Sequence, residues 1–421
     1  MGIVLGCVAD DFTGATDLAN TLVKQGMRTV QVLGVPDEAT DVGDAEAVVV
    51  AIKSRTAPVA DAVDWSLESL AWLRQRGAKQ FFFKYCSTFD STDQGNIGPV
   101  ADALLEALGG DFTIACPAFP TTGRTIYKGH LFVGDVLLSD SSMKDHPLTP
   151  MRDASLVRVL GRQTPHKVGL VEYATVTQGA DSVRAAYARL AADGHRHAIV
   201  DAITDADLTT IGAASSALTL ITGGSGIALG LPANYRGAGL IGEAAPAELP
   251  RPTGRGAVLA GSCSVATRGQ VAAVADKWPT RHIDPFELHR DKDTVAALLD
   301  WAASQPADTP ILIASSDAPE NVGKVQAELG REAAGALVEN AFGELAKGLV
   351  DMGVRQLIVA GGETSGAAIS ALDVPALRIG PEIDPGVPWC ESLGEPALAL
   401  ALKSGNFGDK DFFAKAFGML R

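Results

Sequence analysis

The sequence predicts an α/β protein of two domains, each with a largely parallel sheet flanked by helices. Short apolar runs alternate with helical patterns along nearly all of the chain, which is typical of βα units. Many of these runs end in a polar or glycine-rich turn just before the next helix. The chain has 421 residues, more than a single hydrophobic core normally covers, so we expect two cores and therefore two domains.

The composition is that of a globular protein, with 47% hydrophobic and 20% charged residues. No apolar run approaches the ~20 residues of a membrane span, and Met1 to Val4 lead directly into a strand pattern without a secretion signal. We therefore expect a cytoplasmic protein with no membrane partner. The five cysteines are scattered and form no C-x-x-C pair, and the net charge of −15 argues against a nucleic-acid partner. The oligomeric state stays open, with a homodimer as one candidate.

The first βα unit carries two adjacent aspartates. Ile3 to Ala9 form an apolar run, Asp10 and Asp11 follow it, and a helical pattern runs from Ala15 to Gln25. Ligands of open α/β sheets bind outside the carboxyl ends of the strands, where these carboxylates would lie. Two neighbouring carboxylates repel each other unless a cation, a metal or a substrate hydroxyl uses them. We expect one aspartate to cap or orient and the other to act chemically.

Cations and hydroxyls follow the next predicted strands of the first half. Those strands are Arg28 to Gly34, Glu46 to Ile52, Gln80 to Phe83 and Phe112 to Cys116. The polar residues that come after them, and that we expect to bind substrate, are Arg55, Lys84, Ser87, Thr88 and Arg124. If the strands are parallel, these side chains converge with the aspartates at one edge of the sheet. Such a set suits a small polyhydroxy acid, whose carboxylate needs cations and whose hydroxyls need hydrogen-bond partners.

Two weakly patterned stretches interrupt the βα rhythm. Thr125 to Pro165 read as a long loop, a feature that is usually functional or mobile. Glu243 to Gly256 contain three prolines and read as a linker, which sets the predicted domains at residues 1–245 and 246–421.

The second half contains three glycine turns of the phosphate-binding type. They are Gly261 to Ser264, Ala360 to Gly366, and Lys403 to Gly408, each after an apolar run. Glycine lets a backbone approach a ligand closely, and the first N–H groups of a helix suit a phosphate. No G-x-x-x-x-G-K-[ST] motif occurs, so a P-loop enzyme is excluded. A formal G-x-G-x-x-G occurs at Gly237 to Gly242, but no clear strand precedes it and no helix follows it. This absence weakens the hypothesis that the protein is an NAD-dependent oxidoreductase.

Longer motifs resemble a known family, the four-carbon acid-sugar kinases, over nearly the whole chain. The matching stretches are ADDFTGATD, FKYCSTFDST, GNIGPV, CPAFPTTGRT, GHLFVGD, HPLTPM, GSCS, AGGETSGA and KSGNFG. The chain looks most similar to the 3-oxo-tetronate 4-kinases, chiefly through KYCSTFDST. The resemblance implies an N-terminal sugar-acid-binding domain, a C-terminal nucleotide-binding domain and an active site in the cleft between them. It also implies transfer of phosphate from ATP, with Mg²⁺, to the 4-hydroxyl of a 3-oxo-tetronate.

The resemblance also assigns residues. Its nucleotide contacts correspond to Ser262, Gly361, Gly362, Glu363, Thr364 and Gly405. Glu363 is expected to hold either the metal or a ribose hydroxyl, and the metal ligands stay unassigned. For the base that accepts the 4-hydroxyl proton we choose Asp11, with Asp10 as the alternative. Two further functions stay open: a non-catalytic sensor of sugar acids, and a kinase specific for threonate or erythronate.

Overall fold

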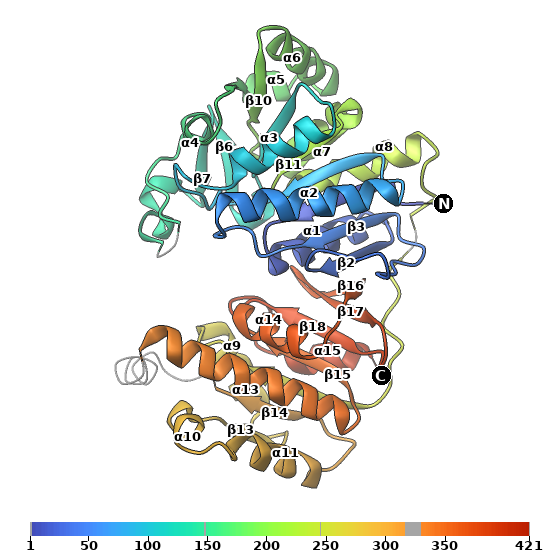
Figure 1. Ribbon diagram of the computed structural model, residues 1–421, viewed down its shortest axis with the longest axis vertical. Coiled ribbons are helices and arrows are strands. Elements are labelled where there is room, and N and C mark those ends of the chain that lie inside the picture. Colours follow the sequence, from blue (N-terminus) through green and yellow to red (C-terminus); the bar gives the residue numbers. More distant parts are fainter. Residues whose placement is uncertain (1, 147–148, 245, 316–329, 421) are drawn as a thin grey trace. The chain divides into compact units, whose positions relative to one another are not determined.

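The computed structural model describes residues 2–146, 149–244, 246–315 and 330–420. The chain divides into two compact units, Met1–Pro246 and Ala247–Arg421, here called the N-terminal and the C-terminal unit (Figure 1). None of the described helices combines the length and the apolar character needed to cross a lipid bilayer.

The N-terminal unit is built on a parallel sheet with the strand order β2-β3-β1-β4-β11-β5-β10-β9. The strands are β1 Leu5–Ala9, β2 Thr29–Leu33, β3 Ala47–Ala51, β4 Gln80–Lys84, β5 Thr113–Cys116, β9 Lys167–Val171, β10 His195–Val200 and β11 Leu220–Gly223. Every residue of β1, β3 and β4 is buried, which explains why these strands read as continuous apolar runs. The prediction of a parallel sheet in this half is confirmed.

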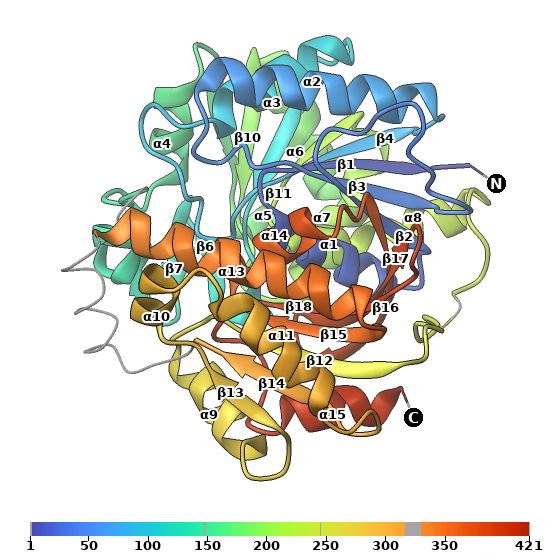
Figure 2. The same ribbon diagram turned by 60° about the horizontal axis from the view of Figure 1, so that its bottom comes forward.

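Helices cover both faces of this sheet. They are α1 Phe12–Lys24, α2 Val59–Gln75, α3 Ile97–Ala107, α4 Leu156–Gln163, α5 Tyr173–Val176, α6 Ala180–Ala192, α7 Asp205–Ala214 and α8 Leu231–Gly237. Figure 2 shows α2 and α3 on one face and α1 on the other. The chain winds from β1 to β2 in one direction and from β3 to β4 in the other, and right-handed crossovers then place the connecting helices on opposite faces. The order of winding therefore changes at β1, between β3 and β4.

The prediction that Thr125 to Pro165 form a long loop is wrong in part. Its first part forms a small antiparallel sheet of β6 Arg124–Tyr127, β7 His130–Val133 and β8 Val136–Leu137, and its last part contains α4. Buried Asp201 anchors the β6–β7 turn, because its carboxylate accepts bonds from the backbone N–H groups of Lys128 and Gly129, each at 2.8 Å. Such short strands show no clear alternation in sequence, so their pairing depends on contacts with distant residues.

The C-terminal unit has a mixed sheet with the order β13-β14-β12-β15-β18-β17-β16. The strands from β13 to β18 in that order pair in parallel, and β17 and β16 continue the sheet antiparallel. They are β12 Arg255–Ala260, β13 Thr280–His282, β14 Ile311–Ala314, β15 Val354–Ala360, β16 Ala376–Asp384, β17 Val387–Leu393 and β18 Ala399–Lys403. The antiparallel hairpin is an addition to the predicted βα pattern.

The helices of this unit are α9 Val265–Val274, α10 Pro285–Arg290, α11 Thr294–Ser304, α13 Arg331–Asp351, α14 Gly362–Ala371 and α15 Phe412–Met419. The predicted helical region from Gln326 to Met352 contains α13, and residues 326–329 lie outside the described residues. Fully buried Trp389 packs in a core with Phe412, Phe413 and Phe417, and its indole N–H donates to the carbonyl of Ala416 at 2.9 Å. This aromatic cluster fixes α15 on the sheet that carries the glycine turns.

Candidate active site

The two aspartates lie at the carboxyl end of β1, where the winding of the N-terminal sheet changes direction. Asp11 is the N-cap of α1, and its Oδ1 accepts a bond from the backbone N–H of Gly14 at 3.0 Å. The side chain of Asp10 is 6% exposed and that of Asp11 is 31% exposed. The more accessible of the two carboxylates is therefore the one at the helix start.

Arg55, which follows β3, joins both aspartates. Its guanidinium donates to the two carboxylate oxygens of Asp10 at 2.8 Å each and to Oδ1 of Asp11 at 2.8 Å. Burial is the largest influence on Asp10 and raises the pKa of its carboxyl, while the pair with Arg55 opposes that shift. The carboxylates in turn raise the pKa of Arg55 above its usual value, against the effect of its burial. Arg55 is thus engaged in holding the aspartate pair together.

Lys84, the last residue of β4, borders the same point from the other side of β1. It is buried, and its ammonium donates to the carbonyl of Tyr85 at 2.8 Å. A Cβ added to Gly14 would lie 2.3 Å from Asp11 Oδ1 and 2.7 Å from Lys84 Nζ. Glycine at position 14 therefore lets a carboxylate and an ammonium approach the first turn of α1 from two sides.

The loop after β4 places the predicted hydroxyls differently. Thr88 is buried and donates to Asp90 at 2.6 Å, whereas Ser87 is half-buried. Asp90 Oδ2 lies 3.9 Å from Arg55 Nη1, so Thr88 is linked to the aspartate pair through Asp90 and Arg55. The geometry makes Ser87 the more accessible hydroxyl and Thr88 part of the supporting network.

Arg124 lies at the start of β6, after the carboxyl end of β5. Its guanidinium donates to the carbonyl of Thr122 in the same loop. β5 is three places from β1 in the sheet, a separation of about 14 Å at the usual strand spacing. The structure therefore brings Arg55 and Lys84 directly to the aspartates and leaves Arg124 farther along the same edge.

Three glycine turns of the C-terminal unit lie at the carboxyl ends of the adjacent strands β12, β15 and β18. The N–H of Ser262 donates to the carbonyl of Ala360 at 3.0 Å, and the N–H of Gly361 donates to that of Lys403 at 2.9 Å. The turns are therefore bonded to each other in the order of the strands. All of the predicted nucleotide contacts lie in these three turns.

Close packing explains glycine at three of the turn positions. A Cβ at Gly261 would lie 2.0 Å from the buried Thr364 Oγ1, and one at Gly405 would lie 2.1 Å from Ser262 Oγ. Gly361 has φ = 140° and approaches the N–H of Ser262. The hydroxyl of Thr364 thus fills the space between two turns.

Gly362 and Glu363 differ from these residues because both are exposed, in the first turn of α14. A Cβ at Gly362 would meet no atom of the described residues within 4 Å. The open space in front of this helix start can accept a phosphate, since the first N–H groups of a helix have no partner within it.

Comparison with known proteins agrees with the division into two kinds of unit. Residues 5–231 match a family model described as a sugar-binding N-terminal domain, and residues 257–413 match one described as a nucleotide-binding C-terminal domain. A 3-oxo-tetronate kinase of Burkholderia multivorans is 59% identical over 99% of this chain and 97% of its own length. One of Methylobacterium radiotolerans is 51% identical over the full length of both chains. The chain belongs to the 3-oxo-tetronate kinase family.

Solved structures share the fold of this kinase. A crystal structure from Salmonella typhimurium LT2, provisionally described as a tRNA synthase, has a TM-score of 0.92 at 41% identity over 99% of both chains. One from Haemophilus influenzae has a TM-score of 0.87 at 43% identity and covers 99% of this chain and 100% of that chain.

Sequence reasoning missed two polar residues that support the turns of the kinase. The side-chain N–H₂ of Asn96 donates to the carbonyls of Ser54 and Ala57, at 2.6 and 2.9 Å, and so holds the loop that carries Arg55. Lys403 ends β18 beside Gly405 and is 1% exposed. A lysine directly before a glycine turn was a visible signal, but its burial was not.

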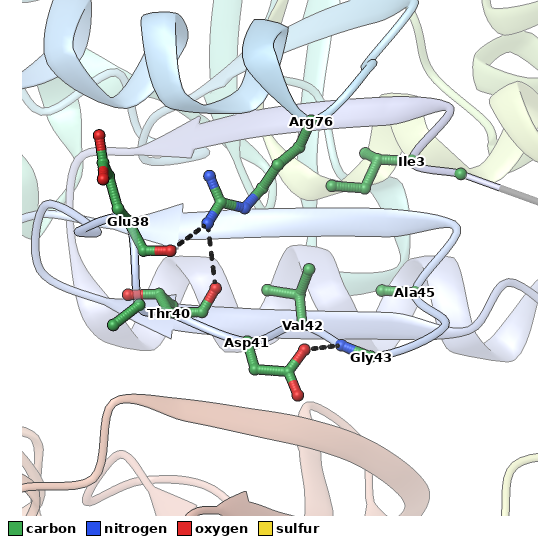
Figure 3. Close-up of a pocket in the computed structure, with 10 residues that line it drawn as sticks. Ile3, Glu38, Thr40, Asp41, Val42, Gly43, Ala45 and Arg76 are labelled. Carbon is green, nitrogen blue, oxygen red and sulfur yellow. Dashed lines mark hydrogen bonds between the residues drawn. The ribbon is translucent and has the colours of Figure 1, made fainter.

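Two cavities lie apart from the aspartate pair. The one in Figure 3, of about 400 Å³, lies before β1 and β3, at the amino edge of the sheet, where Arg76 donates to the carbonyls of Glu38 and Thr40. The other, of about 720 Å³, lies between Ser91 to Gln94 and α4. Its residues Arg158 and Arg162 already pair with Asp153, at 2.7 and 3.2 Å. Neither cavity carries the predicted site residues.

Proposed function

We propose that the protein transfers the γ-phosphate of ATP to the 4-hydroxyl of a 3-oxo-tetronate. Residues 1–245 bind the sugar acid and residues 246–421 bind the nucleotide in this proposal. The observation that carries it is the accessible Asp11 at the end of β1, where the winding of the sheet changes direction, in the unit that matches a sugar-binding domain. The other unit matches a nucleotide-binding domain and bears three linked glycine turns. A sugar-acid kinase needs a carboxylate to accept the proton of the substrate hydroxyl and a site that binds the phosphates of ATP.

Asp11 is the base in this mechanism. Its contacts among the described residues use Oδ1, which leaves Oδ2 to accept the proton of the 4-hydroxyl. The hydroxyl oxygen then forms the bond to the γ-phosphorus as the bond to the β-phosphate oxygen breaks, and ADP leaves. Asp10 is the weaker candidate, because both of its oxygens accept bonds from Arg55.

Lys84 and Arg124 are the cations proposed for the substrate carboxylate, and Ser87 is proposed to bond a substrate hydroxyl. Arg55 and Thr88 contribute to the same site by holding Asp10, Asp11 and Asp90 in place. Charge-assisted bonds of this kind are roughly twice as strong as neutral ones, so they orient a small acid well.

The nucleotide site is proposed at Ser262, Gly361, Gly362, Glu363, Thr364 and Gly405. No group of three or more His, Cys, Asp or Glu side chains suited to a metal occurs within the part of the chain that the structure describes. Mg²⁺ in kinases is usually held by one or two carboxylates together with the phosphates, and the exposed carboxylate of Glu363 at the start of α14 fits that donor set or a ribose hydroxyl. When bound, the ion neutralises charge that develops on the transferring phosphate.

Phosphoryl transfer is an in-line displacement, so the 4-hydroxyl and the γ-phosphate have to meet. The proposal therefore requires the sugar acid and the nucleotide to be bound at the same time during turnover.

The test is ADP formation from ATP with purified protein and a panel of 3-oxo-tetronates, threonate and erythronate. We expect turnover with a 3-oxo-tetronate and a ³¹P signal coupled to the protons of carbon 4. Turnover with threonate or erythronate alone would assign a different specificity. Binding of an acid without ADP formation from any member of the panel would make the protein a sensor.

A further inference from the structure

The buried residue Lys403 has no assigned role, although it lies beneath the third glycine turn. Its ammonium donates to Thr267 Oγ1 at 3.0 Å and to the carbonyls of Ser404 and Gly405 at 3.0 and 3.1 Å. An ammonium has three donors, so these contacts use all of them. Lys403 therefore bonds the turn itself and has no proton left for a ligand.

The carbonyl of Gly405 is turned toward the protein by three donors. Besides Lys403, the hydroxyls of Ser264 and Thr267 donate to it at 2.6 and 2.8 Å. Both hydroxyls belong to the start of α9, which follows the Gly261 to Ser264 turn. The carbonyl of Gly405 thus attaches the third turn to the first one, and Gln270 of α9 adds bonds to the carbonyls of Phe407 and Gly408 at 3.0 and 2.8 Å.

Because the peptide group is planar, the direction of these carbonyls determines the direction of the N–H groups that follow them. The C=O of one residue and the N–H of the next belong to one trans peptide and point in opposite directions. Because the carbonyls of Ser404 and Gly405 point toward Lys403, the N–H groups of Gly405 and Asn406 point away from it. Among the hydrogen bonds of the described residues, neither of these N–H groups donates to a protein acceptor.

The two N–H groups belong to the edge that carries the other turns. Gly405 touches Ser262 so closely that a Cβ would lie 2.1 Å from its Oγ. The N–H of Gly361 bonds the carbonyl of Lys403 at 2.9 Å, which links the same strand end to α14. A phosphate in front of α14 and Ser262 is therefore also beside the third turn.

We propose that the backbone N–H groups of Gly405 and Asn406 bind a phosphate of the nucleotide and that Lys403 is the positioning residue that presents them. This inference rests on the proposed function and adds Asn406, Lys403, Ser264 and Thr267 to the nucleotide site. Lys403 acts through the turn, unlike a lysine that touches phosphate directly. Consecutive backbone N–H groups are a common form of anion site, and an ammonium behind them adds positive potential.

Substitutions at Asn406 separate the backbone donor from the side chain. Asn406→Pro removes the N–H, whereas Asn406→Ala keeps it and is the matched control. The probes are ADP and adenosine, measured by titration calorimetry or ligand competition, because only ADP offers phosphate. We expect Asn406→Pro to lower the affinity for ADP roughly tenfold or more and to leave the affinity for adenosine unchanged. We expect Asn406→Ala to bind both ligands as the wild type does.

Lys403→Met and Thr267→Val test the positioning role. Both are near in shape to the native side chains and remove donors to the turn, so we expect each to lower the preference for ADP over adenosine. Equal losses for the two ligands would show a merely structural role and overturn the inference. If Lys403→Met does not fold, Thr267→Val and the Asn406 pair decide the question.

The outcomes also separate this inference from the proposed function. If wild-type protein binds no ADP, the proposed function itself fails. If it binds ADP and the Asn406→Pro and Thr267→Val variants keep the wild-type preference, only the role of the third turn is overturned.

Discussion

The first four strands of the two units have the same order in their sheets, but the residues at the carboxyl ends of these strands differ. The order is β2-β3-β1-β4 in the N-terminal unit and β13-β14-β12-β15 in the C-terminal unit, so the first strand of each is central. In the first, β1 ends in Asp10 and Asp11, which meet Arg55. In the second, β12 ends in a Gly-Ser turn packed against Thr364.

Under the proposed function, the difference matches what each ligand requires. Side chains would recognise the sugar acid, and the carboxyl ends of the N-terminal strands carry buried charges that hold one another. Backbone N–H groups would recognise the phosphate, and the carboxyl ends of the C-terminal strands carry glycines that let three turns pack together. Sheet topology therefore determines where a site lies, and the residues at the strand ends determine what it binds.

Asp11→Asn is expected to have the largest effect, because it removes the proposed base at the carboxyl end of β1. The amide retains an oxygen for the N–H of Gly14, so the helix cap is kept. We expect kcat to fall ~10²–10⁴-fold, the range of general acid–base catalysis, while ATP affinity stays the same.

Asp10→Asn is the comparison for that variant. It breaks a buried pair with Arg55 and should lower the melting temperature more than Asp11→Asn does. Near-normal kcat in Asp11→Asn together with a large loss in Asp10→Asn would exchange the two roles, and activity in both would remove the base from the mechanism.

Loss of a substrate cation should act on the sugar acid alone. For Lys84→Ala and Arg124→Ala we expect KM for the acid to rise roughly 10–150-fold, the equivalent of about 1.5–3 kcal/mol for a charge-assisted bond, with KM for ATP unchanged. Arg55→Ala should raise it too, together with a loss of stability, since Arg55 holds the aspartates.

The control is Lys53→Ala, which removes an exposed cation near Phe12 at the same edge. If the Lys84, Arg124 and Arg55 variants all behave like this control, the carboxylate of the substrate binds elsewhere.

Gly362→Val tests the proposed phosphate site at the glycine turns of the C-terminal unit. A Cβ at this position meets no atom of the described residues within 4 Å, so we expect the variant to fold normally and its side chain to fill the space in front of α14. We expect ATP affinity to fall at least about tenfold with the melting temperature nearly unchanged. Gly269→Val, within α9 and equally free of contacts, is the matched control. Unchanged ATP affinity in Gly362→Val would place the phosphates away from α14.

Gly14→Ala tests the close approach at the charged edge. Alanine in a helix normally stabilises by about 1 kcal/mol relative to glycine, and Gly161→Ala in α4, which meets no neighbour, should show that gain. Gly14→Ala places its Cβ against Asp11 and Lys84, so we expect no gain in stability and a roughly tenfold loss of kcat. Parallel behaviour of the two variants in thermal unfolding and turnover would show that the site tolerates displacement of these groups.

The smallest expected effect is the pH dependence of nucleotide affinity. Burial lowers the pKa of Lys403 to about 8, and its contacts, a hydroxyl and two carbonyls, do not titrate in this range. The folded protein loses this proton near pH 8 while the unfolded chain keeps it up to its ordinary pKa near 10.5, so the contribution of Lys403 to stability increases with pH in that window.

The positive charge behind the turn disappears in the same window. We expect ADP affinity to fall about two- to fivefold between roughly pH 7 and 9, with a flat profile in Lys403→Met. A parallel decline in both proteins would assign the dependence to another group.

Much of the fold was predictable because the signals are local. The buried strands β1 and β3 read as apolar runs, and Gly361 and Gly405 follow strands in sequence. The hairpins were not predictable, because β6, β7, β16 and β17 are defined by pairing between segments and by anchors such as Asp201. For the candidate site, the sequence predicted that the residues at the strand ends lie along one edge of the sheet. It did not predict that Arg55 bonds both aspartates.

The sequence by itself determined the α/β class, the kinase family and the residue types at each strand end, because apolar periodicity and motifs depend only on order along the chain. Tertiary structure decided which polar groups are already satisfied: Arg55 by Asp10 and Asp11, and Lys403 by Thr267 and the turn carbonyls. The contacts of Arg55 with the aspartates and of Lys403 with Thr267 join residues far apart in sequence, and burial makes them necessary, since a charged group away from water requires a partner.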